Sequence, residues 1–411
     1  MENTHRTSSQ LCTQLRCHLN LIILFRILLR VRLIRAMEST GIPEWDQWDE
    51  EFEEQLVMDL IEEQLVGELL REPPPTCHRK RRAVNERVQN FYHTPWGQLI
   101  ENPESANPKS ALGKKFRRRF RMPFPLFLHL VDLCEEHNIF FMRYRSRIPI
   151  EAKVLACLRI LGRGSCADDI SELSSNMMSE STIHPMFRTF VKGVQKHLFP
   201  LLVRKPEGTY LQEVLALYAR LGLPGACGSM DCTRIKWWMC PTIYKFKATG
   251  KEGYPTLVFQ VVVDHLRRVH HVSKYFLGSS NDVMICQNDD FTLEVMAGAL
   301  DDVEYELYDQ SGNKYKCRGG YLIVDGGYID HIRFVDPDKH RISREAVLWS
   351  EWMESVRKDV ECFFGILKAR FRFFKHGVEY HDAETIEAAF KTAATFHNMI
   401  LIFDRRYFVK Y

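Results

Sequence analysis

The apolar and polar positions of the chain predict three short helices between residues 150 and 197. Polar turns separate three segments in which apolar side chains recur at helical spacing: residues 151–161, 167–173 and 183–198. Ser165 is a candidate cap for the second helix, and Ser179 opens the third. Such triplets are typical of helix-turn-helix units, which present the last helix to a DNA groove, but they also occur as ordinary packing motifs. Under the first interpretation Thr182 and Arg188 would contact DNA.

After Gly222 the pattern changes to strands and then to one long helix. Runs with strand composition follow one another at residues 228–239, 256–263, 269–277 and 321–324. Helical spacing returns over residues 351–374, where one apolar stripe contains Val356, Val360, Phe364, Leu367 and Phe371. We therefore predict an α/β fold with a mixed sheet flanked by helices.

These patterns divide the chain into three predicted parts: a tail of low order over residues 1–110, a helical, helix-turn-helix-like region over residues 111–220, and the α/β domain over residues 221–404. Within the tail, residues 44–72 predict an amphipathic acidic helix. It is either solvated within a disordered acidic tail or a docking helix for a partner protein. Residues 1–36 are apolar and arginine-rich, and their apolar run is too short to span a bilayer. They are either a mitochondrial-type presequence or an over-extension before a true start at Met37.

Charge and cysteine content narrow the class of protein. The 411-residue chain has a net charge of +3, but residues 44–72 hold twelve acids and one base, so the remainder carries +14. A basic body suits a polyanionic partner such as DNA, and no membrane association is expected. Twelve cysteines are spread without a C-x-x-C pair, which argues against a zinc module and a disulfide framework and favours a reducing compartment.

Two basic clusters fit this picture. Residues 78–82 read His-Arg-Lys-Arg-Arg, which is typical of nuclear-import signals, so we expect a nuclear protein. Residues 114–121 place four arginines around Phe116 and Phe120, whose spacing lets one helix face pack. The four arginines are Arg117, Arg118, Arg119 and Arg121. They either contact DNA phosphates or form a solvated basic face.

Three acidic residues stand where a metal site would need them. Asp231 lies within a strand, where Asp is disfavoured, Asp325 closes the strand at residues 321–324, and Glu361 lies at the edge of the long helix's apolar stripe. Carboxylates from two strands and a helix could converge on two divalent metal ions, the usual means of cleaving a phosphodiester. Because oxygen ligands suit a hard cation, Mg²⁺ (or Mn²⁺) is expected.

Two further positions near these acids have alternative explanations. Arg357 and Lys368 flank Glu361 and are candidate DNA contacts, although Arg357 could instead form an i,i+4 ion pair with Glu361. Asp264 competes for a catalytic place, but residues 264–268 are better explained as a hairpin turn.

Five short sequence segments resemble, in order, the motifs of Harbinger-type plant transposon proteins. They are Gly228-Ser229-Met230-Asp231-Cys232-Thr233, Gly278-Ser279-Ser280-Asn281-Asp282, Tyr321-Leu322-Ile323-Val324-Asp325-Gly326, the run over residues 357–371, and His397-Asn398-Met399-Ile400. The resemblance implies an RNase H-like nuclease domain in which Asp231, Asp325 and Glu361 form an Asp-Asp-Glu site for two Mg²⁺ ions. It also implies a Myb-like accessory protein as a candidate partner of the acidic helix; a homo-oligomer is another candidate assembly.

We therefore predict a transposase that cleaves element ends and joins them to target DNA. The main alternative is a domesticated, non-catalytic DNA-binding protein that retains the fold, and a nuclease of repair or processing is a third. The retained acids argue against the domesticated form. Residues 1–100 match no motif, and Val269-His270-His271-Val272 replaces the family's aromatic-rich strand after the hairpin.

Overall fold

The parts of the chain described in a computed structural model are residues 91–140, 148–175, 177–309, 311–338 and 343–408. All of them fall in one unit, Leu60–Tyr411. The predicted acidic helix over residues 44–72 and the basic cluster over residues 78–82 lie outside these ranges and stay predictions. No helix within the ranges is long and apolar enough to cross a membrane.

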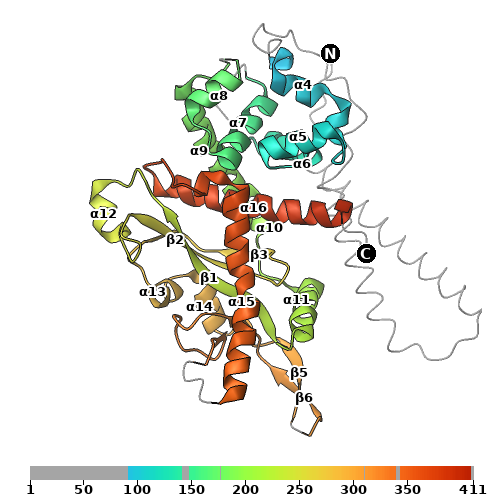
Figure 1. Ribbon diagram of the computed structural model, residues 1–411, viewed down its shortest axis with the longest axis vertical. Helices are drawn as coiled ribbons and strands as arrows, with labels where there is room; N and C mark the ends of the chain where they lie inside the picture. The colour runs from blue at the N-terminus through green and yellow to red at the C-terminus, as the bar shows by residue number, and fades with distance from the viewer. Residues whose placement is uncertain (1–90, 141–147, 176, 310, 339–342, 409–411) are drawn as a thin grey trace, which may run out of the picture. The chain divides into compact units, whose positions relative to one another are not determined.

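Helices form the first half of the described chain (Figure 1). In order they are α4 (Pro95–Glu101), η1 (Pro103–Ala106), α5 (Ala111–Phe120), α6 (Phe124–Glu136), α7 (Ile150–Arg163), α8 (Ala167–Leu173), α9 (Glu180–His197), α10 (Phe199–Leu202) and α11 (Gly208–Arg220). The three predicted helices are confirmed as α7, α8 and α9. The predicted packing face of α5 is also confirmed, since Phe116 and Phe120 are buried with ring centroids 4.7 Å apart. The predicted Ser165 cap is wrong, because the Sγ of Cys166 accepts the Asp169 N–H at 3.4 Å and caps α8.

A mixed sheet follows the helices. Its strands are β1 (Ala226–Lys236), β2 (Thr256–Val263), β3 (Val269–Val272), β4 (Phe276–Leu277), β7 (Tyr321–Ile323) and β8 (Phe334–Val335). β1 pairs antiparallel with β2 and parallel with β7, so the order across the sheet is β3-β2-β1-β7-β8, with β4 also beside β2. The predicted α/β class with a mixed sheet is therefore confirmed.

The run over residues 269–277 forms two short strands, β3 and β4, where one strand was predicted. Both pair antiparallel with β2, and the chain leaves the ladder between them at Ser273. The Ser273 N–H donates to the Gln260 carbonyl at 2.9 Å, while the Ser273 hydroxyl accepts the Gln260 N–H at 3.0 Å. A side chain that replaces a backbone acceptor in this way ends the regular ladder.

Short elements connect the strands of the sheet. They are α12 (Thr242–Ala248), α13 (Asp282–Cys286), α14 (Asp290–Met296), β5 (Glu304–Tyr308) and β6 (Lys314–Arg318). β5 and β6 pair with each other as a separate antiparallel hairpin with mostly exposed side chains. This hairpin lies between α14 and β7 in the chain.

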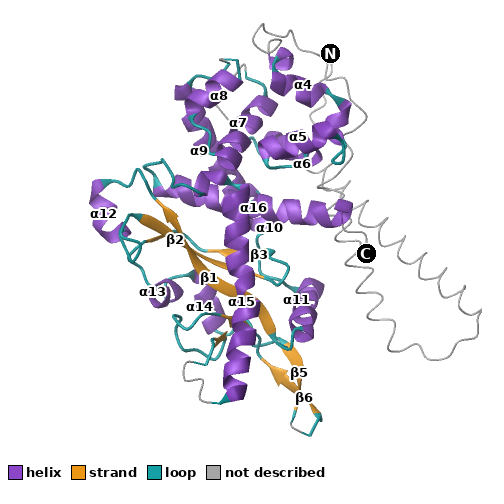
Figure 2. Ribbon diagram, viewed as in Figure 1, coloured by secondary structure: helices purple, strands orange, loops and turns teal. Residues whose placement is uncertain are grey.

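Two long helices, α15 (Arg344–Arg370) and α16 (Ala383–Phe408), complete the fold, with the short η2 (Arg372–Phe374) between them. α15 runs along the sheet against β1 (Figure 2). Its buried stripe contains Phe363, whereas Phe364, which was predicted for that stripe, is only partly buried. The reason is tertiary: the Phe363 ring packs edge-on against His397 of α16, with centroids 5.0 Å apart.

Asn398 of α16 joins three parts of the fold. Its Oδ1 accepts the Val269 N–H at 2.9 Å, and its Nδ2 donates to the carbonyls of Val269 and Leu202 at 2.8 Å each. One buried amide therefore satisfies backbone groups of β3 and α10, which would otherwise cost about 1–3 kcal/mol each if left unpaired. These hydrogen bonds give Asn398, in the motif His397-Asn398-Met399-Ile400, a structural role that does not involve catalysis.

His397 gives a prediction about acid stability. Burial, together with the neighbouring Arg370, lowers the pKa of His397 to about 3. Below its unfolded pKa of about 6.5, the unfolded chain therefore binds a proton that the folded chain does not, and the free energy of unfolding falls as pH falls. His397 should account for a loss of about 2 kcal/mol between pH 7.5 and pH 5.

Urea unfolding at the two pH values measures this loss. His397→Gln should be less stable than the wild type at pH 7.5 but should have a flatter pH dependence. His93→Gln, which changes an exposed histidine, should keep the wild-type pH dependence. An equally steep decline in His397→Gln would contradict the assignment.

Candidate active site

The register between β1 and β7 aligns two of the predicted acids. Ser229 pairs with Ile323 in the parallel ladder, and Asp231 and Asp325 each follow two residues later. Because side chains alternate with a period of two, the register places Asp231 of β1 and Asp325, two residues beyond the end of β7, on the same face of the sheet, whose neighbouring strands are about 4.8 Å apart. Asp231 and Asp325 are therefore as far apart in the sequence as the paired residues Ser229 and Ile323.

α15 covers that face and contributes the third acid. Met353 and Val356 of α15 pack with Ala226 and Ile323, so the helix lies on the side of the sheet that buries Ile323. Arg357 follows Val356 directly and reaches the acids from there.

One guanidinium group joins two of the three carboxylates. Nη1 of Arg357 lies 3.0 Å from Asp231 Oδ2, and Nη2 lies 2.7 Å from Glu361 Oε1. Asp325 is within electrostatic range of this group, because Asp231, Glu361 and Asp325 together raise the pKa of Arg357 against the opposing effect of its burial. The i,i+4 ion pair weighed as an alternative for Arg357 is therefore present, and it is one half of a larger bridge.

Asp231 is the most enclosed of the bridged acids. Its side chain is 17% exposed, compared with 46% for Glu361. The pKa of Asp231 is raised to about 6: burial is the largest cause, Asp325 and Glu361 add to the rise, and the Cys232 N–H and Arg357 oppose it. The Cys232 N–H donates to Asp231 Oδ1 at 2.7 Å, and the Gly327 N–H donates to Asp325 Oδ1 at 2.9 Å. Fixed backbone donors thus orient both aspartates.

A fourth carboxylate, Asp282, borders the site and was not predicted as a site residue. A Cβ atom on Gly327 would lie 3.1 Å from Asp325 Oδ1 and 3.4 Å from Asp282 Oδ2, so the two acids approach the same small space. Oδ1 of Asp282 is buried and has no hydrogen-bond partner among the described residues. The signal in the sequence was the motif Gly278-Ser279-Ser280-Asn281-Asp282. Its Asn281 caps α13 by accepting the Met284 N–H at 2.8 Å.

The donor set fits a hard divalent cation in its chemistry. Every candidate ligand is a carboxylate oxygen, Gly327 leaves room beside two of them, and one oxygen of Asp282 lacks a partner. In the arrangement around Arg357, however, the acids are not close enough together: no three His, Cys, Asp or Glu residues in the described ranges could hold a metal ion. The positive charge between the acids in this structure is the Arg357 guanidinium.

Comparison with known families adds evidence that is independent of this geometry. Residues 201–407 match the family described as plant transposon protein. The chain belongs to this family. No curated protein and no solved structure matches it. In this plant transposon protein the match contains Asp231, Asp282, Asp325 and Glu361, whereas helices α4 to α9 lie before it.

The predicted DNA contacts of the transposon protein have different surroundings. Arg117 forms a two-pronged ion pair with Asp404, at 2.7 and 2.6 Å, and Lys368 donates to the Arg234 carbonyl at 3.2 Å. Both side chains thus have partners within the fold.

Other predicted contacts are more open. Arg118 is exposed, and Arg119 and Arg121 are partly exposed. At the start of α9, the Thr182 hydroxyl lies 2.9 Å from that of Ser179, and the exposed Arg188 stands over the Tyr380 ring at 5.9 Å.

Asp264 lies in the hairpin turn, as expected. Its Oδ1 accepts the Arg268 N–H at 2.9 Å, and its Oδ2 accepts the Tyr210 hydroxyl at 3.0 Å and lies 3.4 Å from His270. Burial alone would raise the pKa of Asp264, but His270, the Arg268 N–H and Tyr210 hold it below its usual value. Asp264 is thus a buried structural acid of the β2–β3 turn.

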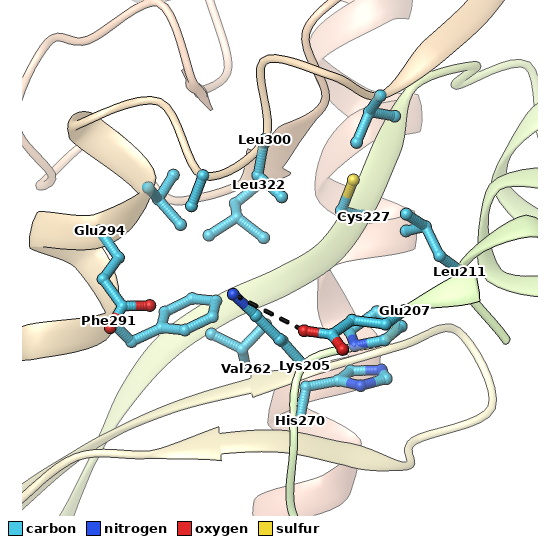
Figure 3. Close-up of a pocket in the computed structure, with 14 residues that line it drawn as sticks. Lys205, Glu207, Leu211, Cys227, Val262, His270, Phe291, Glu294, Leu300 and Leu322 are labelled. Atoms are coloured by element: carbon cyan, nitrogen blue, oxygen red, sulfur yellow. Dashed lines mark ion pairs between the residues drawn. The ribbon is translucent and has the colours of Figure 1, made fainter.

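A small cavity lies on the face of the sheet opposite the acids (Figure 3). Cys227, Val262 and Leu322 line it and belong to an apolar cluster separate from the one that contains Val356. Lys205 and Glu207 form an ion pair at its edge, with 3.7 Å between Nζ and Oε1. Its volume of about 130 Å³ is below the range of about 300–1,000 Å³ that is typical of ligand pockets, so we assign it no ligand.

The bridge through Arg357 predicts strong coupling between its members. Arg357→Met should destabilise the protein, because it leaves Asp231 enclosed without its countercharge. Asp231→Asn in the same chain should recover part of the loss, which gives a coupling free energy of about 0.5–3 kcal/mol. Urea unfolding of the two single variants and the double variant, in EDTA at pH 7.5, measures this coupling. Strictly additive effects would show that the two side chains do not interact in solution.

Proposed function

We propose that this plant transposon protein is an Asp-Asp-Glu transposase that cleaves DNA and joins the freed strand to a target. The observation that carries the proposal is the arrangement of Asp231 and Asp325 on one face of adjacent strands, with Glu361 bridged to Asp231 through Arg357. The mixed sheet, antiparallel from β1 to β3 and parallel at β7 and β8, is compatible with the RNase H-like fold that the motifs imply.

Asp231 and Asp325 would hold two Mg²⁺ ions, with Glu361 completing one of the two shells. Such a pair of ions, when bound, activates the attacking oxygen and stabilises the leaving oxygen of a phosphodiester. The backbone donors from Cys232 and Gly327 keep the aspartates oriented for this task. Arg357 competes with any metal ion for the same oxygens, so metal binding requires the guanidinium to give up part of its bridge.

The proposal includes the surroundings of the reaction. The substrate is DNA, at the ends of a mobile element and at its target, and the compartment is the nucleus. A Myb-like accessory protein would dock on the acidic segment over residues 44–72, and a homo-oligomer would bring two element ends together. These partners follow from the motif resemblance and the charge pattern.

The first prediction for this function concerns the three acids. Asp231→Asn, Asp325→Asn and Glu361→Gln should each abolish Mg²⁺-dependent cleavage of element-end DNA while DNA affinity stays within a few-fold of the wild type. Combining them should add little, because residues that act as one unit have non-additive effects. Glu351→Gln, which changes an exposed acid at the other end of α15, is the matched control and should cleave normally. Near-normal turnover by any of the three variants would disprove the assignment of that residue.

A second prediction concerns metal binding without turnover. Mg²⁺ should raise the melting temperature of the wild-type protein, and at a free concentration of about 100 times Kd the stabilisation should approach 2.7 kcal/mol. Asp231→Asn and Asp325→Asn should lose this shift, Glu351→Gln should retain it, and Mn²⁺ should give the same pattern. Equal shifts in all four proteins would place the ion elsewhere.

The same measurement addresses the main alternative, a domesticated DNA-binding protein without catalysis. The specific observation in favour of this alternative is that Arg357 already forms ion pairs with Asp231 and Glu361. A wild-type protein that binds DNA but shows neither a Mg²⁺-dependent shift nor cleavage would support the alternative over the transposase.

A further inference from the structure

Four arginines line one cavity between α5 and α7. Its volume is about 330 Å³, and its lining consists of Arg118 and Arg119 from α5 and Arg159 and Arg163 from α7. Arg159 is held in place by a bond from its Nη1 to the Arg119 carbonyl, at 3.4 Å. The cavity thus brings together the predicted basic cluster of α5 and two arginines that the sequence analysis did not single out.

The positive charges around this cavity have no ion-pair partner among the described residues. None of its four arginines forms an ion pair with a carboxylate in the parts of the chain that the structure describes, whereas the adjacent Arg117 is paired with Asp404. The Nε atoms of Arg159 and of the nearby Arg121 are buried without an acceptor among the described residues. Burial lowers the pKa of Arg159, Arg163, Arg119 and Arg121 lower it further, and Asp169 opposes these effects. Grouping like charges in this way is costly unless an anion neutralises them.

The lining selects the chemistry of that anion. Guanidinium groups match the oxygens of a phosphate in two-pronged pairs, and no aromatic ring lines the cavity on which a base could stack. No side chain of the lining accepts a hydrogen bond, so the donors of a base edge have no partner there. These features favour a backbone phosphate over a nucleobase or a free nucleotide.

We infer that this four-arginine cavity is a phosphate subsite for the backbone of duplex DNA, which anchors the substrate without reading its sequence. The inference deepens the proposed function, since it takes the DNA of that reaction as its ligand. Because the lining consists of arginines alone, the subsite contributes affinity and leaves the chemical step to the acids.

Salt dependence of DNA binding tests the inference. Arg118→Gln with Arg163→Gln removes two exposed members of the cavity, and neither side chain forms an ion pair within the described residues. In the full chain, with EDTA and a random 30-base-pair duplex, fluorescence anisotropy should give a log–log salt slope smaller in magnitude by about 0.9, equal to one phosphate contact. Arg204→Gln with Arg220→Gln, which removes two exposed arginines elsewhere, should leave the slope unchanged. A melting temperature equal to that of the wild type shows that a variant is folded.

Two further arms separate the alternatives. Arg163→Lys keeps the charge, so it should retain the slope while weakening binding, because the two-pronged geometry is lost. If inorganic phosphate raises the melting temperature of the wild type but not of the double Gln variant, and the DNA slopes are equal, the site takes free phosphate and the DNA inference is overturned. Equal slopes without that shift overturn it as well.

The inference and the proposed function can fail separately. A reduced slope in a protein that cannot cleave would retain the subsite and remove the transposase assignment. If the wild type cleaves DNA normally at saturating DNA, and the double Gln variant has an unchanged salt slope, the transposase assignment is retained and the subsite is removed.

Discussion

The mutual repulsion of acids gathered on one face of the sheet is the constraint on which the functional half of this structure depends. Asp231 and Asp325 share that face because of the β1–β7 register, and Glu361 approaches from α15. Like charges gathered in this way repel one another unless a cation lies among them. Arg357 supplies that cation: its contact with Asp231 joins α15 to β1, and its contact with Glu361 lies within α15.

Other polar contacts hold α15 at the same place. Asp359 is bound by His265 of the β2–β3 turn at 2.6 Å, and Lys368 donates to the Arg234 carbonyl of β1. With these contacts on either side of Glu361, the position of that acid follows from the position of the helix. The hydrogen bond to β1 gives Lys368 a structural role in addition to any contact with DNA. Burial lowers the pKa of its ammonium group.

Local pattern in the sequence was sufficient for the features that depend on local physics. Helical spacing located α7, α8 and α9, and strand composition located β1, β2 and β7, because each element buries its own apolar side chains. The placement of Asp231 and Asp325 was also accessible, since an acid within or just after an apolar strand is unusual enough to need an explanation. Features set by distant parts of the chain were not accessible. Ser273 divides the predicted strand through a bond to Gln260.

Contacts between residues far apart in the sequence also decide which arginines remain open to a ligand. The periodicity of the sequence could not predict these contacts. The basic run in α5 looks uniform in sequence, yet Asp404, almost three hundred positions away, neutralises Arg117. Arg118 and Arg119 instead lie beside Arg159 and Arg163, and none of these four forms an ion pair with an acid among the described residues. The cationic groups of the chain therefore have opposite surroundings: Arg357 lies among acids, and the α5–α7 arginines lie among one another. Acids gathered at one site and arginines at another are the two features on which the proposed function rests, in which a polyanion is held at the arginines and cleaved at the acids.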